Sequence, residues 1–171
     1  MIVVSDTSPL NYLVLINEID LLPKLFGQVI IPEAVLAELS HRGSPEAVRK
    51  WAGASPPWLT IRIVSPIQLP RNLGSGETEA ISLAIELNAK LLLLDDRKAR
   101  NLARERGLNV AGLLNVLETA SIRELVDLPR VIARLRQTNF RAPADIVRAI
   151  LQRNSQRQEA KAQPASNPSL D

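Results

Sequence analysis

Acidic side chains follow two short apolar runs of the sequence. Residues 2–4 are apolar and lead into Ser5 and Asp6, and residues 91–94 are all leucine and lead directly into Asp95 and Asp96. Short apolar runs of this kind are typical of strands buried in a parallel sheet. Because ligands bind outside the carboxyl ends of the strands in open α/β sheets, the acids are expected to converge on one crevice.

Three glutamates are candidates to join that crevice. Glu38 lies in the segment PEAVLAEL, and Glu77 and Glu79 lie at the start of the segment ETEAISLAIEL. Carboxylates that meet without a neighbouring Lys or Arg repel one another strongly, and a divalent cation removes that repulsion. Hard oxygen ligands favour Mg²⁺ or Mn²⁺. The residues therefore indicate a carboxylate site for one of these ions.

Each acid also has an ordinary structural interpretation. Asp6 and Asp95 could cap the helices that follow them. Glu77 and Glu79 could complement a helix dipole, and Glu38 could be a solvated helix residue. Each interpretation is reasonable for one acid alone, and the shared placement of the acids favours the metal site.

Other common chemistries fit the sequence poorly. The chain has no Cys, and His41 is its only histidine, which excludes a thiolate or histidine-rich zinc site. A Ser–His–acid triad would need His41, which follows a predicted helix end beside Arg42 and is expected at the surface. Glycine-rich nucleotide-binding patterns are absent. We therefore expect a metal-activated water to attack a phosphodiester, whose added negative charge a metal ion stabilises.

The surrounding sequence predicts strands that alternate with helices. Strands are expected at residues 2–5, 28–31, 59–64, 90–94 and 108–111, and helices at 8–17, 20–26, 32–39, 44–52, 77–87, 97–106, 113–122, 128–137 and 143–153. This order predicts an α/β fold with a central parallel sheet and helices on both faces.

The domain organisation is predicted from the same pass along the chain. Residues 1–153 are expected to form one domain, with a core over about 1–122 and extra helices over about 123–153. Residues 154–171 lack hydrophobic periodicity and are expected to be a disordered tail.

Composition and charge narrow the class of partner. Aromatic residues make up 3% of the 171, so a base-stacking surface is not expected. Residues 1–96 carry 7 Lys and Arg against 11 Asp and Glu, a net charge of −4, whereas residues 97–171 carry 14 against 7, a net charge of +7. The ordinary interpretation is solvated helix faces, and the functional one is a basic surface that holds a polyanion.

The compartment is predicted from what the sequence lacks. The chain contains no apolar run long enough for a membrane span and no basic region before its first apolar run. Because Cys is also absent, we expect a reducing cytoplasm and no membrane association.

Four segments, VSDTSPLNYL, IIPEAVLAEL, GSGETEAISLA and LLLLDDRKAR, occur in an order and spacing that resemble the PIN-domain family of metal-dependent nucleases. The resemblance covers about residues 1–120 and is closest to small prokaryotic VapC-like toxins. It implies a Rossmann-like α/β/α sandwich whose acids bind Mg²⁺ or Mn²⁺ and hydrolyse RNA.

The resemblance also assigns roles to residues of this chain. It implies that Asp6, Glu38, Glu77 and Asp95 are the catalytic acids, that Asp6, Glu77, Asp95 and Asp96 are metal ligands, and that Ser8 and Glu79 are supporting residues. From the basic character of the helix predicted over 97–106, we expect the RNA backbone to be held by Arg97, Lys98, Arg100 and Arg104. Family members often have Asp where this chain has GETEA, so Glu79 stays a rival to Glu77. The choice between Asp95 and Asp96 also stays open.

The resulting hypothesis is a divalent-metal-dependent endoribonuclease that acts as the toxin of a toxin–antitoxin pair. Its expected partners are RNA and a small antitoxin protein, and we expect a homodimer. Two alternatives are a catalytically silent PIN-like module that binds RNA or protein, and a DNA-processing nuclease that uses the same acids.

Overall fold

The structure, a computed structural model, describes residues 1–163, and the contacts of the chain define two compact units. Unit 1 is Met1–Val116, and unit 2 begins at Leu117. The boundary between the units lies inside a helix, α7 (Leu113–Ile122), and the single domain over 1–153 stays a prediction. A boundary inside a helix carries no change of composition that the sequence could reveal.

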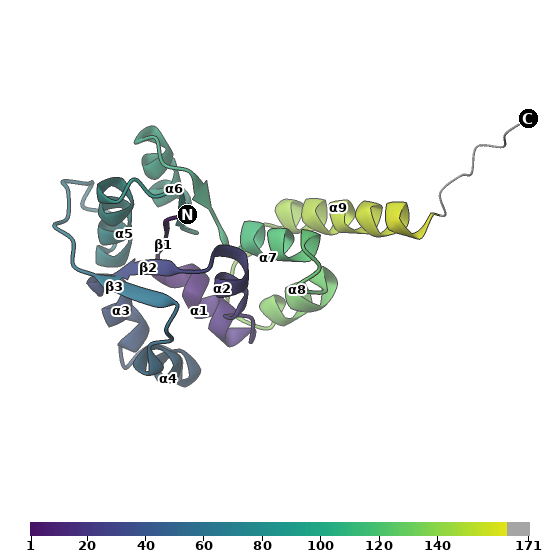
Figure 1. The fold of residues 1–171 in the computed structure, drawn as a ribbon, viewed down its shortest axis with the longest axis horizontal. Helices are drawn as coiled ribbons and strands as arrows, with labels where there is room; N and C mark the ends of the chain where they lie inside the picture. The colour runs from purple at the N-terminus through teal and green to yellow at the C-terminus, as the bar shows by residue number, and fades with distance from the viewer. Residues whose placement is uncertain (164–171) are drawn as a thin grey trace, which may run out of the picture. The chain divides into compact units, whose positions relative to one another are not determined.

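Unit 1 contains all five strands found in the described part of the chain (Figure 1). Its elements are β1 (Val3–Ser5), α1 (Thr7–Leu15), α2 (Leu21–Phe26), β2 (Val29–Pro32), α3 (Glu33–Ser40), α4 (Glu46–Ala54), β3 (Leu59–Arg62), α5 (Ser75–Glu86), β4 (Leu91–Leu93), α6 (Arg97–Glu105), β5 (Val110–Ala111) and the first part of α7. Every strand predicted from the sequence is present, with ends that agree to within two residues.

The strands form one parallel sheet in the order β3-β2-β1-β4-β5. The chain moves from the central strand β1 outward through β2 and β3, then returns to the other side of β1 for β4 and β5. The predicted parallel sheet is confirmed. The position between β1 and β4 is the point at which the strand order reverses, where α/β sheets place their ligand crevice.

Helices cover both faces of this sheet. In Figure 1, α1, α3 and α4 lie on one side of the strands, and α5 and α6 lie on the other. Right-handed crossovers produce this arrangement, because the direction of strand addition reverses after β3. Val4 and Leu92, on the two central strands, are fully buried. The three-layer α/β architecture expected from the sequence is confirmed.

Two helices of unit 1 begin earlier than the sequence indicated. Helix α1 starts at Thr7, with Asp6 rather than Ser8 at the N-cap position. Helix α5 starts at Ser75, which places Glu77 at its third residue. Asp6 therefore stands at the N-cap of α1, and Glu77 lies in the first turn of α5.

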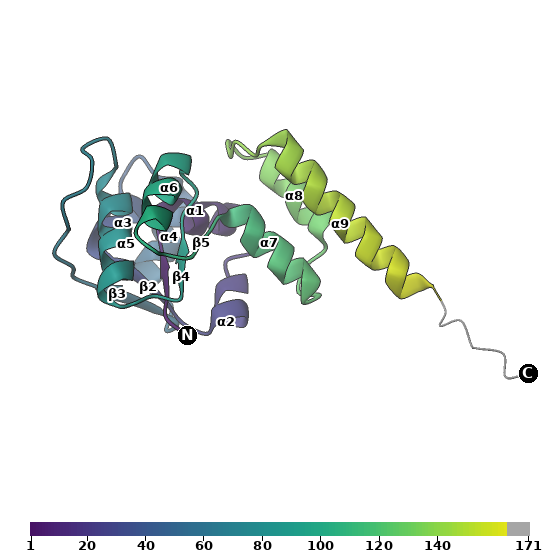
Figure 2. The same cartoon turned by 90° about the horizontal axis from the view of Figure 1, so that it is seen from above.

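Unit 2 consists of the end of α7, α8 (Leu128–Arg136) and α9 (Ala144–Ala162), and Figure 2 shows α8 and α9 alongside each other. The predicted disordered tail is wrong over residues 154–162, which continue α9. Gln, Glu, Lys, Arg and Ala are good helix formers even without an apolar stripe. Asn154 is buried and accepts a hydrogen bond from the Ser121 hydroxyl (2.8 Å). Residues 164–171 of the predicted tail lie outside the described residues.

Over the described residues, no helix combines the length and the apolar character that a bilayer crossing requires.

Candidate active site

Two acids stand side by side at the carboxyl edge of the sheet because their strands are neighbours. Ser5 of β1 is in register with Leu93 of β4, and the Asp6 N–H donates to the Leu93 carbonyl (2.9 Å). Asp6 follows β1 directly, and Asp95 follows β4 after one further buried leucine. The convergence predicted from the two apolar runs is therefore observed.

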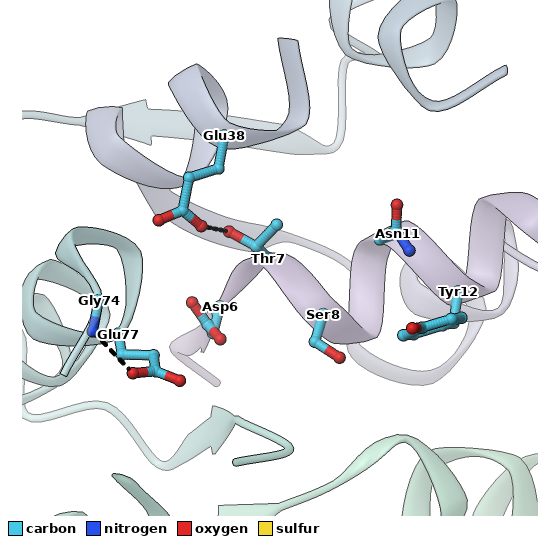
Figure 3. Close-up of a pocket in the computed structure, with 8 residues that line it drawn as sticks. All are labelled: Asp6, Thr7, Ser8, Asn11, Tyr12, Glu38, Gly74 and Glu77. Carbon is cyan, nitrogen blue, oxygen red and sulfur yellow. Dashed lines mark hydrogen bonds between the residues drawn. The ribbon is translucent and has the colours of Figure 1, made fainter. Parts of the chain in front are cut away.

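A pocket of about 450 Å³ opens at this edge (Figure 3). Its lining comes from the β1–α1 junction, α1, α3 and the start of α5, and comprises Asp6, Thr7, Ser8, Asn11, Tyr12, Glu38, Gly74 and Glu77. Three of the four acids that the sequence resemblance marked as catalytic thus line one pocket, and the fourth, Asp95, contacts it through Ser8.

Asp6 is the most deeply buried acid of the pocket, with 5% of its surface exposed. Its Oδ1 is buried and finds no hydrogen-bond partner among residues 1–163. Burial raises the pKa of Asp6 from 3.8 to about 7, the Thr7 N–H opposes this rise, and the charges of Glu77, Glu38 and Asp95 add to it. Burial and the neighbouring acids therefore disfavour the ionised form of Asp6, and a cation in the pocket would favour it.

Glu38 is held at the N-terminus of α5 by several donors. It accepts hydrogen bonds from the Thr7 hydroxyl, the Gly76 N–H (2.9 Å) and the Ser75 hydroxyl (3.4 Å). A Cβ at Gly76 would lie 2.6 Å from Glu38 Oε2, closer than any ordinary contact. Glycine is therefore required at position 76 if the carboxylate is to approach the helix end this closely.

Glu77 and Glu79 point to different partners, as their two-residue separation on a helix predicts. Glu77 lines the pocket and accepts from the Gly74 N–H (3.0 Å). Burial raises the pKa of Glu77, Gly74 opposes this rise, and the charges of Asp96 and Glu38 add to it. Glu79 instead accepts from the Ala34 N–H (2.9 Å) at the start of α3, so it joins two helices outside the pocket lining.

Asp95 and Asp96 also have different partners. Asp95 accepts from the Ser8 hydroxyl (2.9 Å) and from the Leu113 N–H (2.7 Å) at the start of α7. Burial raises the pKa of Asp95, and both donors and the nearby Arg100 oppose that rise. Asp96 is exposed and caps α6 by accepting from the Ala99 N–H (2.9 Å). The helix-capping alternative considered for Asp95 is therefore realised by Asp96.

The basic residues predicted to hold RNA lie on α6 in two environments. Arg97, Lys98 and Arg104 are exposed. Arg100 is partly buried against Asp95, and a Cβ at Gly112 would lie 2.9 Å from Asp95 Oδ1 and 3.3 Å from Arg100 Nη1. Arg100 thus acts locally as a counter-charge to Asp95. Binding of RNA by these residues stays a prediction.

Sequence reasoning missed several residues of the pocket. Thr7 donates to Glu38, Asn11 and Tyr12 line the pocket from α1, and Gly76 allows the close approach of Glu38. Asn11 and Tyr12 lie three and four positions after Ser8, which places all three on one helix face. That spacing could have identified them once Ser8 had been named.

The donors present fit a divalent cation. All candidate ligands are carboxylate oxygens, and the unpartnered Asp6 Oδ1 is the atom that a cation would satisfy. In the part of the chain that the structure describes, no group of three or more His, Asp or Glu side chains is already arranged as a metal cluster. Glu38 and Glu77 are instead turned toward backbone donors.

The acid-lined pocket lies at the reversal point of a parallel sheet, where open α/β folds place their ligand crevice. A family model described as a PIN domain matches residues 2–156, and this chain therefore belongs to the PIN-domain family. PIN domains are generally nucleases and generally use divalent metals. The family resemblance found in the sequence is confirmed.

One solved structure with similarity to this chain is a PilT N-terminus domain protein from the hyperthermophilic archaeon Sulfolobus solfataricus P2. The match covers 84% of this chain and 100% of that chain, at 19% sequence identity and a TM-score of 0.49. Among curated proteins, none matches the chain.

Proposed function

We propose that this protein is a divalent-metal-dependent nuclease that hydrolyses phosphodiester bonds of RNA. The observation that supports it most directly is the buried Asp6 Oδ1, which lacks a hydrogen-bond partner among the described residues at a pocket that Glu38 and Glu77 also line. A buried polar atom without a partner is costly in a stable fold. Retaining one beside two further acids is understandable if the atom binds a cation.

The acids divide into ligands and supports. Asp6 and Glu77 would hold the ion, since both line the pocket and burial raises the pKa of each above its usual value. Glu38 and Asp95 each accept hydrogen bonds from several donors, which fix their negative charges close to Asp6. When bound, a divalent ion supplies activation of water and stabilisation of the charge that develops on the phosphate.

Residues of α1 are placed to orient the nucleotide. Ser8, Asn11 and Tyr12 follow one another along the pocket lining, beyond Asp6 (Figure 3). An amide and a phenol ring on one rigid helix can fix a flexible single strand relative to the acids. The choice of RNA rather than DNA rests on the sequence resemblance.

The test compares metal-dependent cleavage by the wild type and by Asp6→Asn. Purified proteins are incubated with end-labelled single-stranded RNA, or with DNA of the same sequence, at saturating Mn²⁺ or Mg²⁺ and in EDTA. We expect cleavage of RNA by the wild type only with metal, and a loss of at least about two orders of magnitude in Asp6→Asn. Asp20→Asn removes the same charge at an exposed position and serves as the matched control.

The outcomes separate the three hypotheses for this site. Cleavage by Asp6→Asn at the wild-type rate contradicts the metal-site assignment. Preferred cleavage of DNA favours the DNA-processing alternative, and metal binding without cleavage of either substrate favours a catalytically silent module. The toxin role, a small antitoxin partner and a homodimer stay predictions from the sequence.

A further inference from the structure

The basic residues of unit 2 fall into two groups that differ in their partners. Residues 117–163 contain nine Lys and Arg and five Asp and Glu, a net charge of +4. One group is neutralised within the unit: Arg153 and Arg157 pair with Glu118, and Lys161 pairs with Glu124. These pairs join α9 to α7 and its C-terminal end, so they explain part of the positive charge as structural.

The second group includes two arginines that line a cleft. Arg136, the last residue of α8, and Arg148, in the second turn of α9, line a cleft of about 520 Å³ together with Ala144, Leu151, Gln152 and Ser155. The side chains of Arg136, Arg148, Gln152 and Ser155 have no hydrogen bond or ion pair within the described chain. All four can donate hydrogen bonds, and the cleft lining contains no carboxylate.

The spacing of the α9 residues makes the cleft a defined face of the helix. Ala144, Arg148 and Gln152 are four residues apart in succession, and Leu151 and Ser155 form the neighbouring row. The lining residues of α9 therefore turn toward the end of α8. Arg153 belongs to a different face, from which it reaches Glu118 at 2.7 Å.

We propose that this cleft binds a backbone phosphate of single-stranded RNA, at a site separate from the carboxylate pocket. The inference rests on the proposed function for the choice of RNA. Planar guanidinium groups match the oxygens of a phosphodiester in bidentate geometry, and an amide and a hydroxyl can complete its hydrogen bonds. Two arginines on separate helices can clamp one phosphate from two sides.

The composition of the lining favours nucleic acid over an acidic peptide. The cleft offers only Ala144 and Leu151 as apolar contacts and no aromatic side chain. Peptide interfaces usually depend on buried aromatic or large aliphatic anchors, whereas phosphate contacts need only fixed positive donors. The cleft thus gives affinity without reading the base sequence.

The experiment measures RNA binding by the full chain. All proteins carry Asp6→Asn, so that the RNA stays intact, and binding of a fluorescent single-stranded RNA is measured by anisotropy at several salt concentrations with Mn²⁺ present. The test protein adds Arg136→Gln and Arg148→Gln. The control protein instead adds Arg130→Gln and Arg141→Gln, which remove two exposed arginines of the same unit from outside the cleft.

We expect the cleft variant to bind RNA about tenfold more weakly at low salt, and the slope of log affinity against log salt to become shallower by about 0.7, the value for one phosphate contact on a single strand. The control pair should lose far less. Arg136→Lys with Arg148→Lys should keep most of the salt slope, because the charges are retained while bidentate contact is lost.

Three results would overturn the proposal. Equal losses in the cleft and control variants would indicate diffuse attraction rather than a site. Loss of the salt slope in the lysine variant would indicate a structural role for the arginines. Binding of fluorescent polyglutamate is measured in the same way. If the cleft variant loses as much affinity for polyglutamate as for RNA, the ligand is an acidic peptide. Because binding is measured without turnover, failure of the cleavage assay would leave these outcomes interpretable.

Discussion

Metal-free protein should lose stability as pH rises, and Asp6 should cause a defined part of that loss. The pKa of Asp6 is 3.8 as an ordinary carboxyl and about 7 in the folded protein, chiefly because burial disfavours the charged form. The folded state therefore binds this proton more tightly than the unfolded state. The contribution of Asp6 is most favourable below pH 4, declines as pH rises toward 7, and is constant above that range.

The size of the effect follows from the shift. One pKa unit corresponds to about 1.4 kcal/mol, so a rise from 3.8 to about 7 corresponds to about 4 kcal/mol. Asn carries no charge at any pH and lacks this titration. The free energy of unfolding of Asp6→Asn minus that of the wild type should therefore grow from about 0.5 kcal/mol at pH 4 to about 4 kcal/mol at pH 8.

Urea unfolding followed by tryptophan fluorescence provides the assay. Both tryptophans of the chain, Trp51 and Trp58, lie in unit 1 with ring centroids 6.0 Å apart, so the signal reports the unit that contains Asp6. The proteins are compared in EDTA from pH 4 to pH 8, with Asp20→Asn as the exposed control. Saturating Mn²⁺ at pH 8 should stabilise the wild type, by about 2.7 kcal/mol at one hundred times the dissociation constant, and Asp6→Asn much less. Parallel pH profiles for the wild type and Asp6→Asn would contradict the raised pKa of Asp6, because they would show that Asp6 is ionised as readily in the folded state as in the unfolded one.

Two further substitutions test the surrounding residues. Glu77→Gln should lower the cleavage rate by at least about two orders of magnitude, whereas Glu79→Ala should cost about 1 kcal/mol of stability by removing the acceptor of the Ala34 N–H while cleavage by the folded fraction persists; a larger rate loss in the Glu79 variant would reverse the assignment. Gly76→Ala should lower cleavage by about tenfold or more, since its Cβ would lie within 2.8 Å of three Glu38 atoms and displace that carboxylate. Gly53→Ala, whose Cβ would meet nothing within 4 Å, is the matched control, and equal rates in the two alanine variants would show that the position of Glu38 is unimportant.

The sequence predicted the strands and most of the helices well because burial leaves a direct pattern. Residues 91–94 are uninterrupted leucine, and a strand buried on both faces requires nothing else. Residues 154–162 were mispredicted because their helix is stabilised by polar contacts, including the pair between Lys161 and Glu124, and such contacts leave no hydrophobic period.

The candidate site was predictable only in part. Asp6 was identifiable because an acid is unusual directly after a buried strand, and Glu38 and Glu77 because their segments resemble PIN-domain motifs; all three line the pocket. The distinction between Asp95 and Asp96 was not, since it depends on which residue begins α6 and on where the Leu113 N–H lies. Both facts are set by packing that involves distant parts of the sequence.

The acids around Asp6 share one means of stabilisation, a hydrogen bond from a backbone N–H at a helix N-terminus. Glu38, Glu79 and Asp95 each accept a backbone N–H from the first turn of another helix, and Glu77 accepts one at the N-cap of its own. Helix N-termini carry partial positive charge and tolerate carboxylates well. Asp6 also stands at an N-cap, that of α1, yet its Oδ1 is the one buried side-chain acceptor in residues 1–163 without a partner. The fold thus supplies backbone donors to the surrounding acids and leaves a single oxygen at the pocket for an external cation to satisfy.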